Sequence, residues 1–158
     1  MQPRRRILLA AGAAPLLTAC GFQLRQAPNF GFKSIALAMP NTALAIELRR
    51  QIDGTGRLEV VSDPSKAQVV LESAGERRDR IVVSVTATGE VREFVLRIRF
   101  SFRLRTADGR ELLGPTEIQR QIDQSYSESA ALSKEAEALM LYQNMQSYIV
   151  QQVLRQLA

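Results

Sequence analysis

The residue with the most distinctive chemistry is Cys20, the only cysteine of the chain, which follows Leu17, Thr18 and Ala19. Three arginines at positions 4–6 and an apolar stretch over residues 7–17 precede these residues. A basic, then apolar, then small-residue order is typical of an export signal peptide. A cysteine thiol directly after such a signal can carry a thioether-linked lipid. The pattern predicts a bacterial lipoprotein that is cleaved after residue 19, with S-diacylglycerol and N-palmitoyl groups on Cys20.

The apolar stretch is about half of the ~20 residues that a transmembrane helix needs, so we do not expect a permanent span. Several acyl chains on one residue anchor a protein firmly, whereas a single chain does so only marginally. Two other interpretations of the N-terminal segment are less consistent with its sequence. An ordinary secretory signal with a chance cysteine does not explain the order of residue types. A twin-arginine signal lacks its remaining parts here, so we favour the general export route.

Removal of residues 1–19 leaves 139 of the 158 residues and lowers the net charge from +5 to +2. This length predicts a lead over residues 20–33 and a single domain over residues 34–158. The small charge and the exported location disfavour nucleic-acid binding. The chain has no histidine and no second cysteine. His-based triads and ordinary zinc sites are therefore excluded, and we expect no metal, no cofactor and no enzymatic activity.

The first half of the domain predicts a strand, a helix and a second strand region. Residues 34–39 indicate a buried strand that ends at Pro40, and Asn41 or Thr42 can cap the helix that follows. Leu44, Leu48 and Ile52 recur at helical spacing up to Gly54. Residues 67–72 and 80–88 then indicate one long or broken strand, with a bend or bulge around Gly75 and residues 76–80.

The clearest pattern in the chain is strict alternation over residues 94–105. One face of this predicted strand carries Phe94, Leu96, Ile98, Phe100, Phe102 and Leu104, and the other carries Arg97, Arg99, Ser101, Arg103 and Arg105. Such a strand buries one face and exposes the other. Gly89 and Asp108-Gly109 mark the hairpin turns on either side. A last strand over residues 117–126 follows Gly114-Pro115, which suits a strand start or a sheet edge. Arg120 interrupts its apolar face.

A long helix fills the rest of the chain, with Ser127 or Ser129 as its cap. Its predicted core stripe comprises Leu132, Ala136, Leu139, Gln143, Gln146, Val150, Val153 and Leu157, widened by Met140, Met145, Ile149 and Leu154. The methionines are interpreted as core residues. Together the elements predict an α+β fold in which two helices pack on one face of a mostly antiparallel, roughly four-stranded sheet.

Residues 20–25, with the sequence CGFQLR, resemble the mature start of the LptE family of lipopolysaccharide-assembly lipoproteins. The Thr88-Gly89 turn, the strand after it, the Asp108-Gly109 hairpin and the helix segment 131–137 are similar to later parts of that family. The resemblance implies an outer-membrane lipoprotein that plugs a large LptD-like β-barrel, helps it to assemble, and binds lipopolysaccharide during export. Because Gly21 rather than aspartate follows Cys20, the usual sorting rule implies release to the outer membrane.

Lipopolysaccharide carries phosphates, which arginine and lysine can pair with. Lys134 is the first candidate, because it falls on the matching helix position of the family. The other candidates are Arg92, Arg97, Arg99, Arg103 and Arg105. For the strand arginines, a solvated or barrel-facing charge is the stronger interpretation. Two other functions stay open: an envelope lipoprotein that supports another membrane complex, and a periplasmic hydrolase that uses carboxylates.

Overall fold

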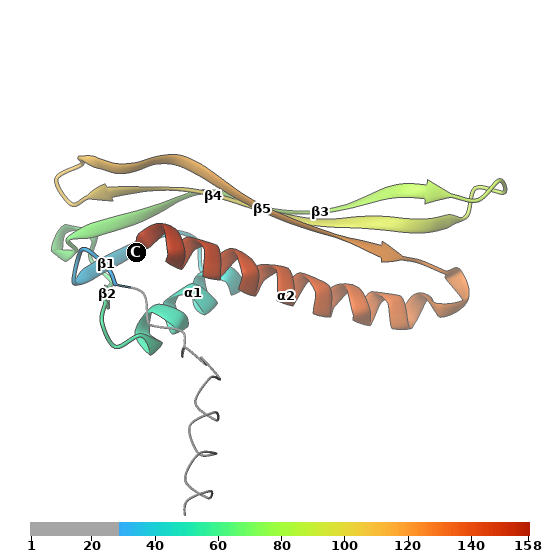
Figure 1. The fold of residues 1–158 in the computed structure, drawn as a ribbon, viewed down its shortest axis with the longest axis horizontal. Coiled ribbons are helices and arrows are strands. Elements are labelled where there is room, and N and C mark those ends of the chain that lie inside the picture. Colours follow the sequence, from blue (N-terminus) through green and yellow to red (C-terminus); the bar gives the residue numbers. More distant parts are fainter. Residues whose placement is uncertain (1–28) are drawn as a thin grey trace, which may run out of the picture.

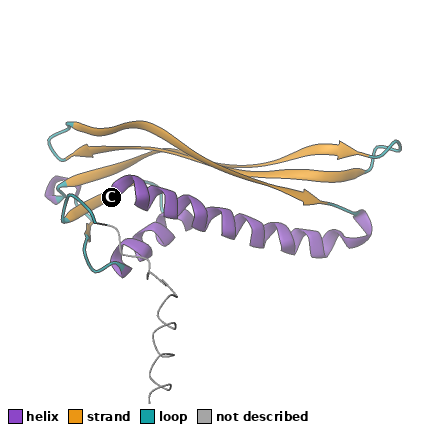
Figure 2. Ribbon diagram, in the orientation of Figure 1, coloured by secondary structure: helices purple, strands orange, loops and turns teal. Residues whose placement is uncertain are grey.

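The computed structural model describes residues 29–158. The predicted signal peptide, Cys20 and most of the lead lie outside these residues. The described chain forms five strands, two α-helices and two short 3₁₀ turns: β1 (Ser34–Ala38), α1 (Ala43–Gly54), β2 (Glu59–Val61), η1 (Pro64–Lys66), β3 (Val69–Val85), β4 (Val91–Thr106), β5 (Glu111–Ser125), η2 (Glu128–Ala130) and α2 (Ala131–Leu157). Figure 2 shows how these elements separate into a sheet layer and a helix layer.

The strands form one sheet in the order β2-β1-β3-β4-β5. β1 pairs parallel with both β2 and β3, whereas β3, β4 and β5 pair antiparallel. The predicted α+β fold with two helices is confirmed. The prediction of roughly four, mostly antiparallel strands is wrong in detail, because the sheet is mixed and has five strands. The sequence did not reveal β2, because its three residues are too few for a periodic pattern.

β3, β4 and β5 are long strands that extend well beyond the short strands β1 and β2 (Figure 1). We call the end that carries β1, β2 and α1 the base, and the end at the β3–β4 turn, residues 86–90, the distal end. β3 is one continuous strand with register shifts between Ser73 and Gly75, between Val82 and Ser84, and between Ser84 and Val85. Gly75 has a φ of 147°, which favours glycine. The predicted bulge at Gly75 is therefore confirmed.

β4 follows its predicted alternation closely. Leu96, Ile98, Phe100 and Phe102 are fully buried and Leu104 is nearly so, while the intervening arginines lie on the outer face of the sheet. β5 begins at Glu111, six residues before the predicted start. Gly114 and Pro115 lie within it, beside a register shift opposite residues 102–104 of β4. A proline is tolerated there because β5 is an edge strand.

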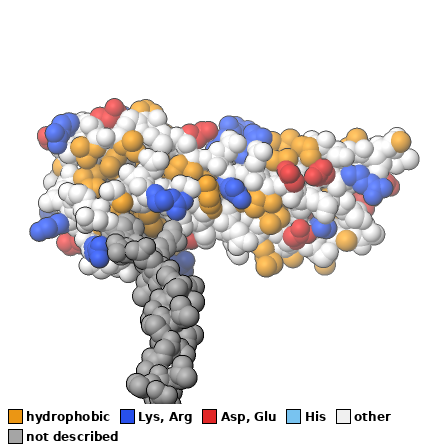
Figure 3. Space-filling view, in the orientation of Figure 1, with side chains coloured by type: hydrophobic (Ala, Val, Ile, Leu, Met, Phe, Trp, Pro, Cys, Tyr) orange, Lys and Arg blue, Asp and Glu red, His pale blue; other side chains and the backbone are white. Residues whose placement is uncertain are grey.

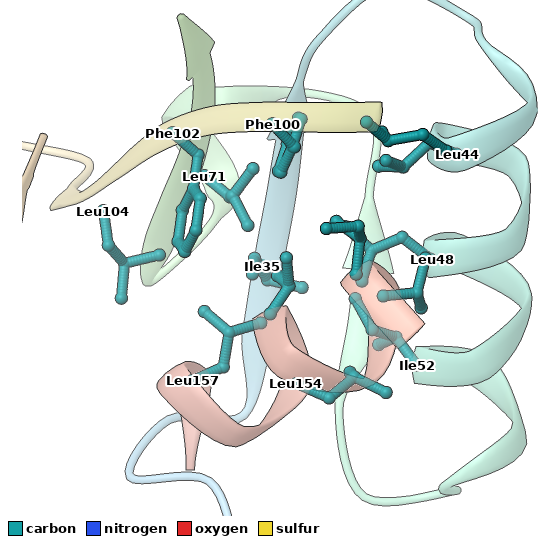
Figure 4. Close-up of a cluster of buried hydrophobic side chains, with 14 of the residues drawn as sticks. Ile35, Leu44, Leu48, Ile52, Leu71, Phe100, Phe102, Leu104, Leu154 and Leu157 are labelled. Atoms are coloured by element: carbon teal, nitrogen blue, oxygen red, sulfur yellow. The ribbon is translucent and has the colours of Figure 1, made fainter. Parts of the chain in front are cut away.

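Both helices lie on the same side of the sheet (Figure 1). Thr42 caps α1 as predicted, since its Oγ1 accepts a hydrogen bond from the Ala45 amide at 3.3 Å. Leu44, Leu48 and Ile52 point from α1 into the core, where they face residues of the sheet and the end of α2 (Figure 4). The base of the molecule therefore contains a well-packed core under both helices.

The prediction for α2 is only half right. Its C-terminal half buries Met145, Ile149, Val150, Val153, Leu154 and Leu157. In its N-terminal half, however, Leu132, Leu139 and Met140 are 90%, 66% and 64% exposed. The apolar stripe predicted for α2 runs along the whole helix, but α1 packs against it only at the base. The residues of the stripe beyond α1 are therefore exposed. The capping prediction is also wrong, because the N-cap residue is Ala130 and no side chain caps α2. Ser127 and Ser129 instead lie 2.8 Å apart, hydroxyl to hydroxyl.

Candidate functional site

Chain connections bring two of the predicted cations to the distal end. β4 begins just after the β3–β4 turn, and β5 ends where the chain turns into α2 (Figure 1). The amide of Tyr126 donates a hydrogen bond of 2.8 Å to the Arg92 carbonyl, which extends the β4–β5 pairing by one step. Lys134 is the fourth residue of α2. Arg92 and Lys134 therefore belong to the same end of the molecule.

The Lys134 side chain is fixed at the junction of β5 and α2. Its Nζ donates to Ser125 Oγ at 3.1 Å and to Glu137 Oε2 at 2.8 Å. The side chain is 22% exposed, so the ammonium group can still meet a ligand. The Lys134 carbonyl also accepts a hydrogen bond of 2.7 Å from the buried Gln124 amide. These contacts position the lysine before any ligand arrives.

An open hollow of about 290 Å³ lies beside Arg92. It is lined by Glu90, Val91, Arg92, Tyr126, Ser127, Glu128 and Ser129. Within residues 29–158 the Arg92 guanidinium makes no ion pair. Glu90 and Glu128 line the same hollow, so its charge is mixed rather than uniformly positive. An anion that binds here must approach from the Arg92 side.

A third distal cation, Arg80, was not among the predicted site residues. Its guanidinium lies 3.9 Å from the centroid of the Phe94 ring and pairs with Glu135 of α2 at 2.6 Å. Phe94 in turn meets Tyr126 edge to face, with 5.1 Å between the ring centroids. Its position on the buried face follows from its pairing with Leu96 of β4, and that cross-strand register cannot be read from the sequence alone. Its charge is neutralised, so its role is to attach β3 to α2.

The other four candidate arginines lie on the outer face of the sheet. Arg103 and Arg105 both pair with Glu72 at 2.6 Å. Hydrogen bonds from these two guanidiniums, chiefly that of Arg105, lower the pKa of Glu72. Arg105 is thirteen residues along β4 from Arg92, or about 40 Å in an extended strand. These two arginines therefore belong to a different region from the distal end.

Arg97 and Arg99 occupy the middle of the outer face. Arg99 pairs with Asp79 at 2.9 Å, and Asp79 also pairs with Arg77 at 2.7 Å. The hydrogen bond from Arg77 is the main reason that the pKa of Asp79 is lowered. Among the described residues Arg97 has no ion pair, and its Nε is buried without a hydrogen-bond partner. The six predicted cations thus form three separate groups rather than one site.

Arg120, which interrupts the apolar pattern of β5, packs against α2. Its guanidinium lies 4.9 Å from the centroid of the Tyr148 ring.

In the described part of the chain, no group of three or more Cys, Asp or Glu side chains is placed to hold a metal ion. Neither described helix is both long enough and apolar enough to cross a bilayer.

Comparison with known proteins identifies the family. A family model described as LptE: Lipopolysaccharide-assembly matches residues 32–157. The solution NMR structure of an uncharacterized lipoprotein B from Nitrosomonas europaea is 33% identical, covers 86% of this chain and 89% of that chain, and has a TM-score of 0.75. No curated protein sequence matches the chain significantly.

Two crystal structures with lower identity share the fold. Rare lipoprotein B from Shewanella oneidensis is 21% identical, with 78% of this chain and 92% of that chain covered and a TM-score of 0.68. A minor lipoprotein from Acinetobacter baumannii is 17% identical, with 82% and 92% covered and a TM-score of 0.66. Since the family model spans almost the whole described chain, the protein belongs to the LptE family of lipopolysaccharide-assembly lipoproteins.

Proposed function

We propose that this protein is an outer-membrane lipoprotein that plugs and helps to assemble the lipopolysaccharide-translocating β-barrel, and that it binds lipopolysaccharide during export. The family match over residues 32–157 carries this proposal. The lipid on Cys20 anchors the domain to the outer membrane, and the domain docks rather than catalyses.

The distribution of polar residues supports a plug. Wide bacterial barrels have polar interiors, so a plug needs a closed core of its own and a polar outer surface. β4 provides both, because its apolar row is buried and three of its four outward-facing arginines, Arg99, Arg103 and Arg105, pair with carboxylates. Neutralised pairs of this kind can face a polar wall without a large excess of either charge.

Arg92 and Lys134 are the residues that we assign to lipopolysaccharide phosphates. Arg92 is unpaired among the described side chains, and Lys134 shares its charge only with the half-exposed Glu137 and a serine hydroxyl. A phosphate oxygen can replace Glu137 as the acceptor for Lys134, because the displaced carboxylate is free to return to water. Arg103 and Arg105 are assigned a structural role, since displacing them leaves Glu72 without its partners.

Charge reversal tests this assignment. Hydrogen bonds to charged groups contribute about 1.5–3 kcal/mol, so Lys134→Glu and Arg92→Glu should each weaken lipopolysaccharide binding by roughly 10- to 100-fold. Arg50→Glu, on the exposed face of α1 at the base, is the matched control and should change binding less than twofold. Binding is measured with purified protein and lipopolysaccharide, alongside circular dichroism to verify the fold. Unchanged binding in both distal variants would remove these residues from the site.

A further inference from the structure

The distal half of the molecule lacks the second helix that covers the base. α1 and α2 run in the same direction, because Glu47 contacts Gln146 while Gln51 contacts Gln151. The start of α1 therefore lies level with about residue 143 of α2. Beyond that point the apolar residues Leu132, Leu139 and Met140 face solvent. Figure 3 shows apolar side chains gathered over this part of α2 and over the distal sheet.

The same region contains a long free sheet edge. β1 pairs with β3 only over Val69–Glu72, and no other described strand pairs with β3 on that side. Residues 76–85 of β3 therefore present unpaired backbone groups along one edge. Val82, Val83 and Val85 on this segment are 47%, 51% and 56% exposed. The other edge of the sheet, along β5, exposes only one large hydrophobic residue among those described, Leu112.

A hollow of about 320 Å³ lies where a strand continuing the line of β1 would begin. It is lined by Met39, Pro40, Thr42, Ser73, Ala74, Gly75, Glu76 and Phe100. Pro40 turns the chain away from the sheet after β1, so the position next to β3 is vacated at this point. The hollow and the free edge are therefore continuous parts of one surface.

The charge along this edge is positive in net, although its arginines have carboxylate partners. Arg78 pairs with Glu76 at 3.0 Å, whereas Arg77 shares the single carboxylate of Asp79 with Arg99, which leaves one positive charge in excess. The side chains of Arg77 and Arg78 are 73% and 39% exposed, whereas those of Asp79 and Glu76 are only 15% and 14% exposed. A partner segment with carboxylates matches this edge. A second copy of the chain would bring the same arginines with it, and charged edge residues commonly prevent such self-pairing.

We infer that an extended, acidic segment of the barrel partner adds to the sheet beside residues 76–85 of β3, an inference that rests on the proposed plug function. Strand addition of this kind uses main-chain hydrogen bonds for affinity and alternate side chains for specificity. Before the register shifts at residues 82–85, residues 76–82 offer about three or four residues with edge-facing N–H and C=O groups. The apolar side chains of the segment pack on Val82 and on the exposed stripe of α2, and its carboxylates meet Arg77 and Arg78.

Amide hydrogen exchange on the native complex tests the inference. The protein is compared free and in the complex extracted from native outer membranes with mild detergent. We expect exchange within residues 76–85 to slow at least tenfold more than exchange along the other sheet edge, residues 116–125. A complex in which residues 76–85 exchange as fast as in the free protein overturns strand addition and leaves the plug function standing. Failure to recover any barrel overturns both.

A pair of edge variants adds a second measurement. Lysine on an edge strand disfavours strand addition, so Val83→Lys should reduce the barrel recovered with the protein at least tenfold. Leu112→Lys, at a residue of similar exposure on β5, is the matched control and should change recovery less than twofold. Equal recovery for both variants contradicts the inference. Light scattering of the free protein measures its oligomeric state, and we expect a monomer. A dimer in which residues 76–85 are protected from exchange would assign this edge to a second copy of the chain and contradict the inference.

Discussion

Replacing Glu47 by alanine should destabilise the protein strongly, because this charged residue is buried between the two helices. Glu47 lies on α1 and is only 8% exposed. Its carboxylate accepts hydrogen bonds from Gln146 at 2.7 Å, Ser147 at 2.7 Å and Gln51 at 3.0 Å. Gln146 also accepts a hydrogen bond from Arg78 of β3 at 2.8 Å. Glu47 is thus the centre of a polar network that joins α1, α2 and β3 where the distal half begins.

The magnitude follows from what each donor does after the carboxylate is removed. Gln146 is also 8% exposed, so its amide stays buried without a partner, which costs about 1–3 kcal/mol. Ser147 and Gln51 are half-buried and can turn toward water, so each loses about 0.5–1.5 kcal/mol. The greater helix propensity of alanine offsets a few tenths of a kcal/mol. The expected loss is about 2–6 kcal/mol, a large share of a total stability of about 5–15 kcal/mol.

Urea unfolding followed by circular dichroism measures this loss. Glu47→Gln keeps one acceptor oxygen and should lose about 1–2 kcal/mol. Arg49→Ala, on the exposed face of the same helix, should stay within about 0.5 kcal/mol of the parent. A Glu47→Ala protein that unfolds within 1 kcal/mol of the parent protein would show that the network does not fix α2 against α1, and the reasoning would fail.

Four further substitutions test other parts of the structure. The lowered pKa of Glu72 stabilises the fold above the ordinary glutamate pKa of 4.5, and this contribution is lost as the pH falls through the lower folded value; in a pH series of urea midpoints, Glu72→Gln should therefore flatten the acid limb. Leu139→Ser should change the unfolding free energy by less than about 0.5 kcal/mol because the leucine is exposed, whereas Leu154→Ala should lose about 2–5 kcal/mol in the same assay. Gly75→Val should lose about 1–3 kcal/mol through backbone strain alone, since a Cβ at Gly75 meets no atom within 4 Å.

Local pattern predicted the fold well wherever one face of an element is buried along its whole length. The apolar row of β4 is such a case, since its residues from Leu96 to Leu104 are all buried in the core cluster under the helices. α2 is the opposite case. Its sequence carries one continuous stripe, but burial of that stripe depends on where α1 begins, which no residue of α2 encodes. Leu132 and Leu139 were therefore predicted to be buried and are exposed.

The parallel pairing of β1 with β2 and β3 depends on contacts between distant segments. The register Ile35 to Val69 joins residues 34 positions apart, and alternation within either segment does not specify it. The candidate cations show the same limit. Periodicity placed Arg97, Arg99, Arg103 and Arg105 on one face correctly, but it did not show that carboxylates of β3 neutralise three of them.

The distal grouping of Arg92 and Lys134 also required the three-dimensional structure, because it depends on the β5–α2 junction. Arg80 was missed for a related reason. A charged run usually indicates a solvated bend, yet Arg80 lies within a strand and stacks on Phe94. Cross-strand register decides between these two outcomes, and a single sequence does not supply it.

Affinity purification from native outer membranes tests the central claim most directly. The tagged protein, extracted in mild detergent, should bring down one large β-barrel protein in a near-equal amount, and mass spectrometry should find its N-terminus at an acylated residue 20. Recovery of the protein alone, with an unmodified N-terminus at residue 1, would contradict both the docking role and the membrane anchor.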